Sequence, residues 1–258
     1  MKKITLNKIL LMKKKHLGIS CLTSYDASFS KLIDSCGVEV ILVGDSLGEV
    51  IKGDKNTHRV TKEDIIYHTK AVAAGIRNSY LISDLPINTY RTNIQTLNFA
   101  KKLIQECGSD MVKLETDKSH IGMIKFLKKN NIPVCAHIGI KPQRIKYKSQ
   151  YKKQGITEKE KKDLLEEALQ VEKAGADLLI IECINSMLAK KITKQLKIPV
   201  IGIASGKDCD GQILVLYDLL GISYNGIPNF VNNKNYNRKT IEERIKIFIK
   251  KTKKFQRV

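Results

Sequence analysis

Several chemically capable side chains in this 258-residue chain stand directly behind short apolar runs. Asp45 and Ser46 follow the run ILVG, and Glu182 follows LLII. A single aspartate at such a place is commonly a turn residue or a helix cap, so the recurrence of the pattern carries the argument. The side chains placed in this way are Asp26, Asp45, Ser46, Asp84, Lys113, Glu115, His137, Glu182 and Ser205.

Three of these carboxylates indicate a metal site. Two unit charges ~4 Å apart repel by ~4 kcal/mol at an effective dielectric of 20, so Asp45, Asp84 and Glu115 either hold a cation or lie apart. Oxygen ligands without accompanying histidine or cysteine favour Mg²⁺ first and Mn²⁺ second. Lys113 stands two residues before Glu115, on the same face of a strand, where it could bind an anionic substrate; the alternative is a surface lysine.

Glu182 is the candidate general base. Its place behind LLII predicts partial desolvation, which raises the pKa of a carboxyl group and suits proton abstraction. The alternative is a buried ion-pair partner. His137 could orient substrate or could be a hydrogen-bonded core histidine. The remaining histidines, which show no ligand spacing, are His16, His58, His68 and His120.

The elements that must position these residues follow from the apolar pattern. The runs are continuously apolar rather than alternating, which is typical of parallel strands covered on both faces. Possible capping boxes at Thr61–Asp64, Thr92–Gln95 and Thr157–Glu160 predict helices between them. Seven strands are predicted, at residues 19–25, 39–44, 79–83, 110–114, 133–137, 177–181 and 199–203.

An eighth strand could lie near Leu214 to Ile222, where helix and strand cannot be separated by pattern. No G-x-G-x-x-G follows the first strand, which argues against a dinucleotide-binding sheet. We therefore predict an α/β protein with one (β/α)8 TIM barrel spanning residues 1–258. Residues 229–240 are polar and loop-like, and a basic helix is predicted to follow them.

Composition narrows the function classes. The net charge of +20 raises a nucleic-acid hypothesis, but the lysines are spread over separate amphipathic segments, which favours a lysine-rich surface. No run approaches the ~20 apolar residues of a membrane span, and the N-terminus lacks the features of a signal peptide. The six cysteines form no CxxC pair. We expect a cytoplasmic protein without nucleic-acid or membrane partners.

The motifs, taken in order, resemble ketopantoate hydroxymethyltransferases. The resemblance covers residues 20 to 230, approximately, and rests on the whole series rather than on any one motif. The matching segments are TSYD (23–26), VGDSLG (43–48), VTKEDIIYHTKAV (60–72), DLP (84–86), MVKLE (111–115), PVCAHIGIKPQ (133–143), AGADLLIIEC (174–183), IPVIGIASG (198–206) and DGQILVLYDLLGI (210–222).

This resemblance implies a barrel of the phosphoenolpyruvate/pyruvate superfamily type, assembled as a homodecamer, that catalyses the first step toward pantothenate. The implied reaction moves a hydroxymethyl group from 5,10-methylenetetrahydrofolate to 3-methyl-2-oxobutanoate. By motif, Asp45, Asp84 and Glu115 would hold Mg²⁺, and Glu182 would accept the proton. The residues implied to bind the keto acid are Asp45, Ser46, Asp84 and Lys113, with a minor role open for His137.

Three segments depart from the usual family pattern. Ala204-Ser205-Gly206 replaces Gly-Ala-Gly, His58-Arg59 stands where Leu-Pro is usual, and Asn229 replaces a lysine. The nearest rival is a lyase or mutase of the isocitrate lyase and phosphoenolpyruvate mutase type. Such lyases typically carry a Lys-Lys-Cys-Gly-His loop, and that string does not occur in this chain.

Overall fold

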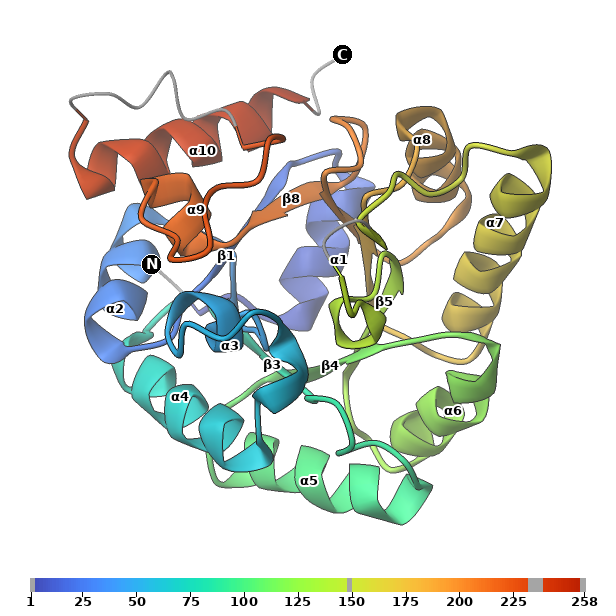
Figure 1. Ribbon diagram of the computed structural model, residues 1–258, viewed down its shortest axis with the longest axis horizontal. Helices are drawn as coiled ribbons and strands as arrows, with labels where there is room; N and C mark the ends of the chain where they lie inside the picture. Colours follow the sequence, from blue (N-terminus) through green and yellow to red (C-terminus); the bar gives the residue numbers. More distant parts are fainter. Residues whose placement is uncertain (1–2, 148–149, 232–238, 256–258) are drawn as a thin grey trace.

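The strands form a closed barrel. In the computed structural model, which describes residues 3–147, 150–231 and 239–255, the strand order is β1-β2-β3-β4-β5-β6-β7-β8 and every neighbouring pair is parallel. Helices surround this barrel in Figure 1. The predicted (β/α)8 fold is confirmed. The strands are β1 Ile19–Thr23, β2 Val40–Val43, β3 Tyr80–Asp84, β4 Met111–Glu115, β5 Val134–Gly139, β6 Leu178–Glu182, β7 Val200–Ile203 and β8 Gly211–Leu214.

All seven strands expected from the apolar runs form. The eighth lies earlier than expected, because β8 ends at Leu214 and a short helix occupies Leu216–Leu220. β8 carries Gly211, where a Cβ would stand 2.3 Å from the carbonyl oxygen of Ile19 on β1. The close approach of β8 to β1, which closes the barrel, therefore requires glycine at this position. Because glycine has no apolar side chain, the apolar pattern that marks the other strands is weak here.

The helices begin where side chains cap them. Thr61 and Thr157 form reciprocal capping boxes with Asp64 and Glu160, whereas Thr92 receives only the backbone N–H of Gln95. The helices are α1 Leu6–Lys14, α2 Ala27–Cys36, α3 Leu47–Val50, α4 Lys62–Gly75, α5 Asn93–Gln105, α6 Ile121–Lys129, α7 Glu158–Lys173, α8 Ser186–Gln195, α9 Leu216–Leu220 and α10 Ile241–Phe255.

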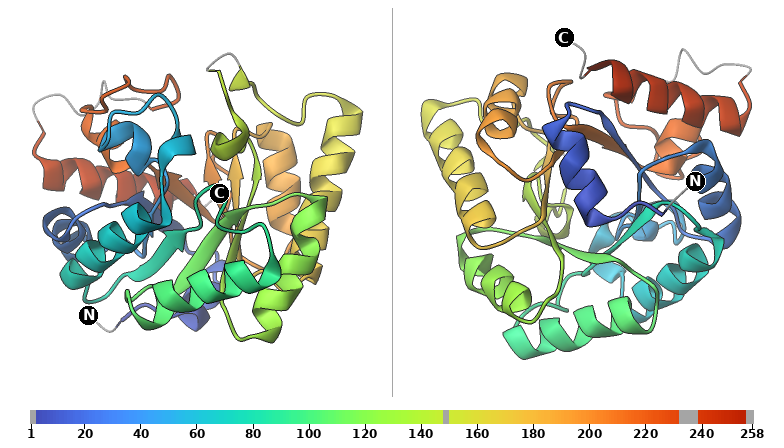
Figure 2. Two further views of the ribbon diagram at one scale, coloured as in Figure 1. Left: turned by 60° about the horizontal axis from the view of Figure 1, so that its bottom comes forward. Right: turned by 180° about the vertical axis from the view of Figure 1, so that it is seen from behind.

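The two ends of the chain cover different parts of the barrel. Helix α1, which was not expected, crosses the end of the barrel that faces away in Figure 1, as the rear view in Figure 2 shows. The predicted C-terminal basic helix is α10, which packs on α2, β1 and α9. Of the predicted polar loop at 229–240, residues 232–238 lie outside the described part of the chain. Among the described residues, no helix is long and apolar enough to cross a membrane.

Alternation along the strands separates two cores. One apolar cluster fills the space between the strands and the helices, and a second, smaller cluster fills the barrel interior. The interior cluster includes Tyr80 and Ile82 of β3 and Leu178 and Ile180 of β6. Since side chains two apart share a face, the next inward positions of these strands are Asp84 and Glu182. The strands thus direct both carboxylates into the barrel mouth.

Candidate active site

The three carboxylates considered as metal ligands do lie close together. The backbone N–H of Asp45 donates to Oδ2 of Asp84 at 3.2 Å. Gln143 connects the other two, because its side-chain amide donates to Oδ2 of Asp45 at 2.9 Å and its backbone N–H donates to Oε1 of Glu115 at 3.0 Å. All three carboxylate residues are buried. The three residues therefore belong to one buried hydrogen-bonded cluster.

Lys113 provides the positive charge within this cluster. Its Nζ donates to Oδ1 and Oδ2 of Asp84 at 2.8 and 2.7 Å, so it is a buried ion-pair partner and not a surface lysine. Burial disfavours its ammonium form, but the carboxylates of Asp84 and Asp45 prevail and raise the pKa of Lys113. One lysine thus faces three acidic side chains.

The three carboxyl groups of the cluster can carry more negative charge than the single Lys113 ammonium group can balance. Burial raises the pKa of Asp84 to about 7, with Lys113 opposing and the Asp45 charge adding to the shift. Burial also raises the pKa of Glu115 well above its usual range, with the Asp45 charge adding to it. Oε2 of Glu115 is buried and has no hydrogen-bond partner among the described residues. A bound cation would relieve both features.

These carboxylate oxygens fit a hard cation that takes its remaining ligands from substrate and water. Across the described parts of the chain, no three His, Cys, Asp or Glu side chains form a ready-made ligand group. Mg²⁺ commonly takes one or two carboxylates and obtains its other ligands from substrate and water. Asp45 and Asp84, with the unpartnered Glu115 oxygen nearby, suit that mode of binding.

Ser46 lies beside the cluster at the start of α3. Its hydroxyl is 2.8 Å from the hydroxyl of Tyr25, and either oxygen could be the donor. Tyr25 is buried and packs edge-on against Tyr217. The Tyr25 side chain therefore holds Ser46 at the edge of the cavity, a role that the sequence alone did not reveal.

Glu182 faces the cavity from β6. Burial raises the pKa of its carboxyl group to about 8, an effect that the Lys113 charge opposes and the Asp45 charge increases. Nε2 of His137 lies 3.3 Å from Oε2 of Glu182, but neither ring nitrogen has a well-aligned hydrogen-bond partner within the described residues. Burial and the Lys113 charge lower the pKa of His137 well below its usual range, which favours the neutral imidazole.

Two strand-end residues stay outside this group. Asp26 caps α2 by accepting the backbone N–H groups of Ser28 and Phe29. The Ser205 hydroxyl donates to the carbonyl oxygen of Ile181 at 3.0 Å and accepts from the backbone N–H of Ile184 at 3.1 Å. Both side chains serve local structure, which is the commoner role for such residues.

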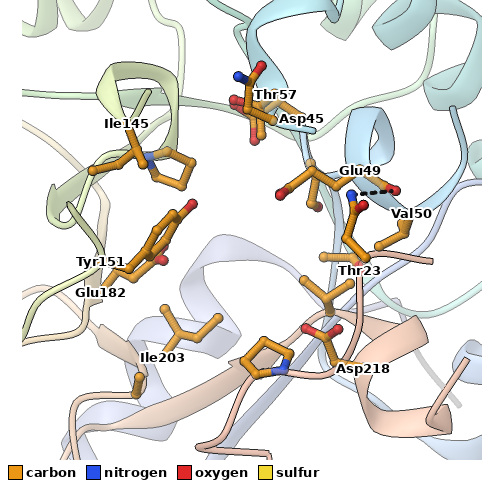
Figure 3. Close-up of a pocket in the computed structure, with 18 of the residues that line it drawn as sticks. Thr23, Asp45, Glu49, Val50, Thr57, Ile145, Tyr151, Glu182, Ile203 and Asp218 are labelled. Carbon is orange, nitrogen blue, oxygen red and sulfur yellow. Dashed lines mark hydrogen bonds between the residues drawn. The ribbon is translucent and has the colours of Figure 1, made fainter. Parts of the chain in front are cut away.

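A cavity of about 580 Å³ opens over these groups. In Figure 3, Tyr151 and Glu182 stand side by side on one wall, and Glu49 and Asp218 come from the other. Burial, followed by the charge of the nearby Glu182, raises the pKa of Tyr151. Gln143, Tyr151 and Asp218 all lie in or near the cavity, and their positions in a 3-10 turn, a loop and helix α9 carried no chemical signal in the sequence.

Two departures from the family pattern contact the same cavity. Ala204 directly follows β7 and has a φ of 51°, a left-handed conformation that glycine adopts with less steric strain. Asn229 lines the cavity as well. His58 and Arg59 form a short 3-10 turn with Thr57, and it is Thr57 that lines the cavity.

The barrel places this chain in a known structural class. It superposes on phosphoenolpyruvate phosphomutase from Streptomyces platensis subsp. rosaceus with a TM-score of 0.62 and 11% identity, covering 83% of this chain and 82% of the other. A phosphonopyruvate hydrolase solved with oxalate and Mg²⁺ gives 0.62 and 12%, covering 83% and 81%. At these identities the likeness establishes the fold: a TIM barrel like those of the phosphoenolpyruvate mutase/isocitrate lyase superfamily.

Comparison of the sequence identifies the protein family, which comparison of the fold alone does not. The profile of the ketopantoate hydroxymethyltransferase family matches residues 3–256, and the chain belongs to that family. It is 46% identical over 249 residues to a 3-methyl-2-oxobutanoate hydroxymethyltransferase of Buchnera aphidicola subsp. Acyrthosiphon pisum (strain 5A), covering 96% of this chain and 94% of the other. A protein of the same name from Shewanella amazonensis is 48% identical, covering 95% and 91%.

Proposed function

We propose that this protein transfers a hydroxymethyl group from 5,10-methylenetetrahydrofolate to 3-methyl-2-oxobutanoate, giving 2-dehydropantoate and tetrahydrofolate. Family membership supports this reaction. The observation that carries the proposal is the partly buried Glu182 carboxylate, which faces the same cavity as Asp45, Asp84 and Lys113. A base and a cation site are thus presented to one small substrate.

The chain's own residues bind and orient the keto acid. Asp45, Asp84 and Glu115 would hold Mg²⁺. The Lys113 ammonium and the Ser46 hydroxyl would bind the keto acid, with Lys113 offsetting its negative charge. When bound, Mg²⁺ supplies positive charge that stabilises the enolate oxygen. His137, a neutral imidazole that lines the same cavity, would orient the substrate.

Glu182 then moves the proton. Its carboxylate takes the proton from C3 of the keto acid, and the electron pair of that C–H bond becomes the enolate double bond. The bond from the methylene carbon to N10 of the folate opens first, N10 takes up the proton removed from C3, and the methylene carbon becomes an iminium on N5. C3 attacks this carbon, and the C=N electron pair moves to N5 as the new C–C bond forms. Water then supplies the hydroxyl oxygen as the remaining bond to N5 breaks, and its proton passes to N5, which releases tetrahydrofolate.

Solvent deuterium exchange into C3 of 3-methyl-2-oxobutanoate tests this chemistry directly. With Mg²⁺, first alone and then with tetrahydrofolate, we expect the wild-type protein to exchange the C3 proton and Glu182→Gln to lose that exchange. The absence of exchange under both conditions would defeat the proposed reaction. Near-wild-type exchange in Glu182→Gln would reject the assignment of the base while leaving the reaction in place.

The metal ligands have their own test. Asp45→Ala, Asp84→Ala and Glu115→Ala should each weaken Mg²⁺ binding by at least ~10-fold, measured by calorimetry, and lower kcat. Asp26→Ala is the matched control, since Asp26 caps α2 and should leave Mg²⁺ affinity unchanged. Unchanged Mg²⁺ affinity in all three site variants would contradict the ligand assignment.

We further propose that the protein acts in the cytoplasm, as a homodecamer, in the first step of pantothenate biosynthesis, with the barrel as its single domain. The family resemblance supports the assembly and the pathway. Sedimentation velocity measures the assembly: a species of ten chains is expected, and a monomer at working concentration would contradict it. Growth of a pantothenate-requiring strain that carries this chain tests the pathway.

A further inference from the structure

Gln143 contacts the acidic cluster at three points. It lies in the 3-10 turn after β5 and is buried, with 2% of its surface exposed. Its side-chain Nε2 donates to Oδ2 of Asp45 at 2.9 Å and to the carbonyl oxygen of Leu85 at 3.0 Å. Its backbone N–H donates to Oε1 of Glu115 at 3.0 Å. Since Leu85 directly follows Asp84, one residue ties together the segments that carry all three carboxylates.

The partners of the Gln143 amide determine its orientation. An ionised carboxylate and a carbonyl oxygen only accept hydrogen bonds, so the amide nitrogen faces Asp45 and Leu85. The amide oxygen faces Tyr90, whose hydroxyl donates to Oε1 of Gln143 at 2.6 Å. The Tyr90 ring packs on the ring of His120, with centroids 5.5 Å apart, and against the apolar core between strands and helices. Tyr90 therefore holds the amide in one orientation.

Gln143 orients carboxylates without adding charge to the cluster. Lys113 forms an ion pair with Asp84, whereas the Gln143 amide is neutral and does not compete with a cation for Asp45. Gln143 also binds only one oxygen of Glu115, because Oε2 is buried and has no hydrogen-bond partner among the described residues. Carboxylates that bind metal ions are themselves held by such outer hydrogen bonds, and these bonds tune metal affinity.

Gln143 and Tyr90 do not share the cavity in which the substrate would bind. Both line a second cavity, of about 440 Å³, and neither is among the described residues that line the cavity of about 580 Å³. Asp45, Asp84 and Lys113 line the larger cavity. Changes at Gln143 and Tyr90 should therefore act on the site through the carboxylates, and not through lost contact with the substrate.

We propose that Gln143 is a positioning residue that orients the Asp45 and Glu115 carboxylates for Mg²⁺. Tyr90 acts through Gln143, because its hydroxyl fixes the amide that donates to Asp45. The inference rests on the proposed function, which assigns these carboxylates to Mg²⁺, and it extends the cation site to two residues beyond the ligands. Loss of either the amide or the hydroxyl weakens Mg²⁺ binding.

Calorimetry with Mg²⁺ on the full chain tests this role. Gln143→Met keeps the side-chain length and the backbone N–H but removes the amide, and we expect its Mg²⁺ dissociation constant to rise about tenfold or more. Tyr90→Phe removes one hydroxyl and should raise the constant by about two- to tenfold. Added to Gln143→Met, Tyr90→Phe should cause no further loss, because its partner is gone.

Tyr80→Phe is the matched control. The Tyr80 hydroxyl donates to the backbone carbonyl oxygen of Asp110 at 3.2 Å, so its removal also deletes one hydrogen bond of a buried tyrosine. This substitution should leave Mg²⁺ affinity unchanged. Equal weakening of Mg²⁺ binding by Tyr80→Phe and Tyr90→Phe would overturn the proposal.

Urea unfolding of the same variants in EDTA separates positioning from a purely structural role. Lower stability of Gln143→Met with an unchanged Mg²⁺ dissociation constant would overturn the proposal. Additive losses in the double variant would overturn the action of Tyr90 through Gln143. A wild-type protein that binds Mg²⁺ but exchanges no C3 proton rejects the proposed reaction instead, whereas one that binds no Mg²⁺ rejects the cation site and the positioning role together.

Discussion

At the scale of single residues, the site keeps acidic groups where their charged forms are costly. Glu182 and Asp84 both have pKa values raised by burial, to about 8 and about 7. Raised values near neutral pH let a carboxyl group take up and release a proton during turnover. The same shifts lower the stability of the folded chain when these groups ionise.

This cost predicts how stability depends on pH. The pKa of Glu182 rises from 4.5 to about 8 on folding, so between these values the folded chain binds more protons than the unfolded chain. The contribution of Glu182 to the free energy of unfolding is therefore fully present below pH 4.5 and is lost as the pH rises through 8.

Glu182→Gln removes this dependence. In EDTA, the variant should become more stable relative to wild type as the pH rises from 5 to 8, by ~1–3 kcal/mol, since one pKa unit corresponds to ~1.4 kcal/mol. Urea unfolding at several pH values measures the difference. Glu63→Gln, an exposed acid on α4, serves as control and should show no such trend. Parallel pH profiles for wild type and Glu182→Gln would contradict the buried-base assignment.

At the scale of elements, the alternation of side chains decides which residues share the site. Apolar runs predicted seven strands. Because side chains two residues apart point to the same face of a strand, Lys113 and Glu115 share the face of the interior residue Met111. What the sequence did not reveal depends on loops: Gln143 reaches Asp45 and Glu115 from the turn after β5. Such contacts between distant segments follow from barrel closure and leave no local pattern.

The ends of two strands also hold unusual backbone. Cys183, directly after Glu182, has a φ of 55°, and Ala204, directly after β7, has a φ of 51°. A left-handed residue other than glycine costs ~1–2 kcal/mol, because Cβ crowds the following carbonyl oxygen. Both residues directly follow a strand and line the cavity.

Ala204→Gly should consequently stabilise the protein, by ~1 kcal/mol in urea unfolding, since relief of the crowding exceeds the added entropy of the unfolded chain. Ala71→Gly, in the middle of α4, is the opposite control and should destabilise by a similar amount. Destabilisation by both substitutions would show that the φ of Ala204 carries no strain.

At the scale of the whole molecule, the barrel has its shortest ladder between β7 and β8. β7 and β8 pair through two residue pairs, Ile201 with Gly211 and Gly202 with Gln212. The two terminal helices contact different parts of the barrel. Lys13 of α1 bonds Asp210, just before β8, at 2.6 Å, whereas Lys253 of α10 contacts Glu39, just before β2. Helix α1 thus supports the β7–β8 pairing directly, and α10 packs beside β1.

The packing of α10 therefore predicts a large effect far from the site. Ile245 is fully buried between α10 and the barrel, so Ile245→Ala should lower the free energy of unfolding by ~2–5 kcal/mol through lost burial and the cavity left behind. Ile241→Ala, at the exposed start of the same helix, should change it by less than ~0.5 kcal/mol. Urea unfolding followed by circular dichroism measures both. Equal small effects would mean that α10 lies on the barrel without stabilising it, and closure would then rest on the strand ladder and α1.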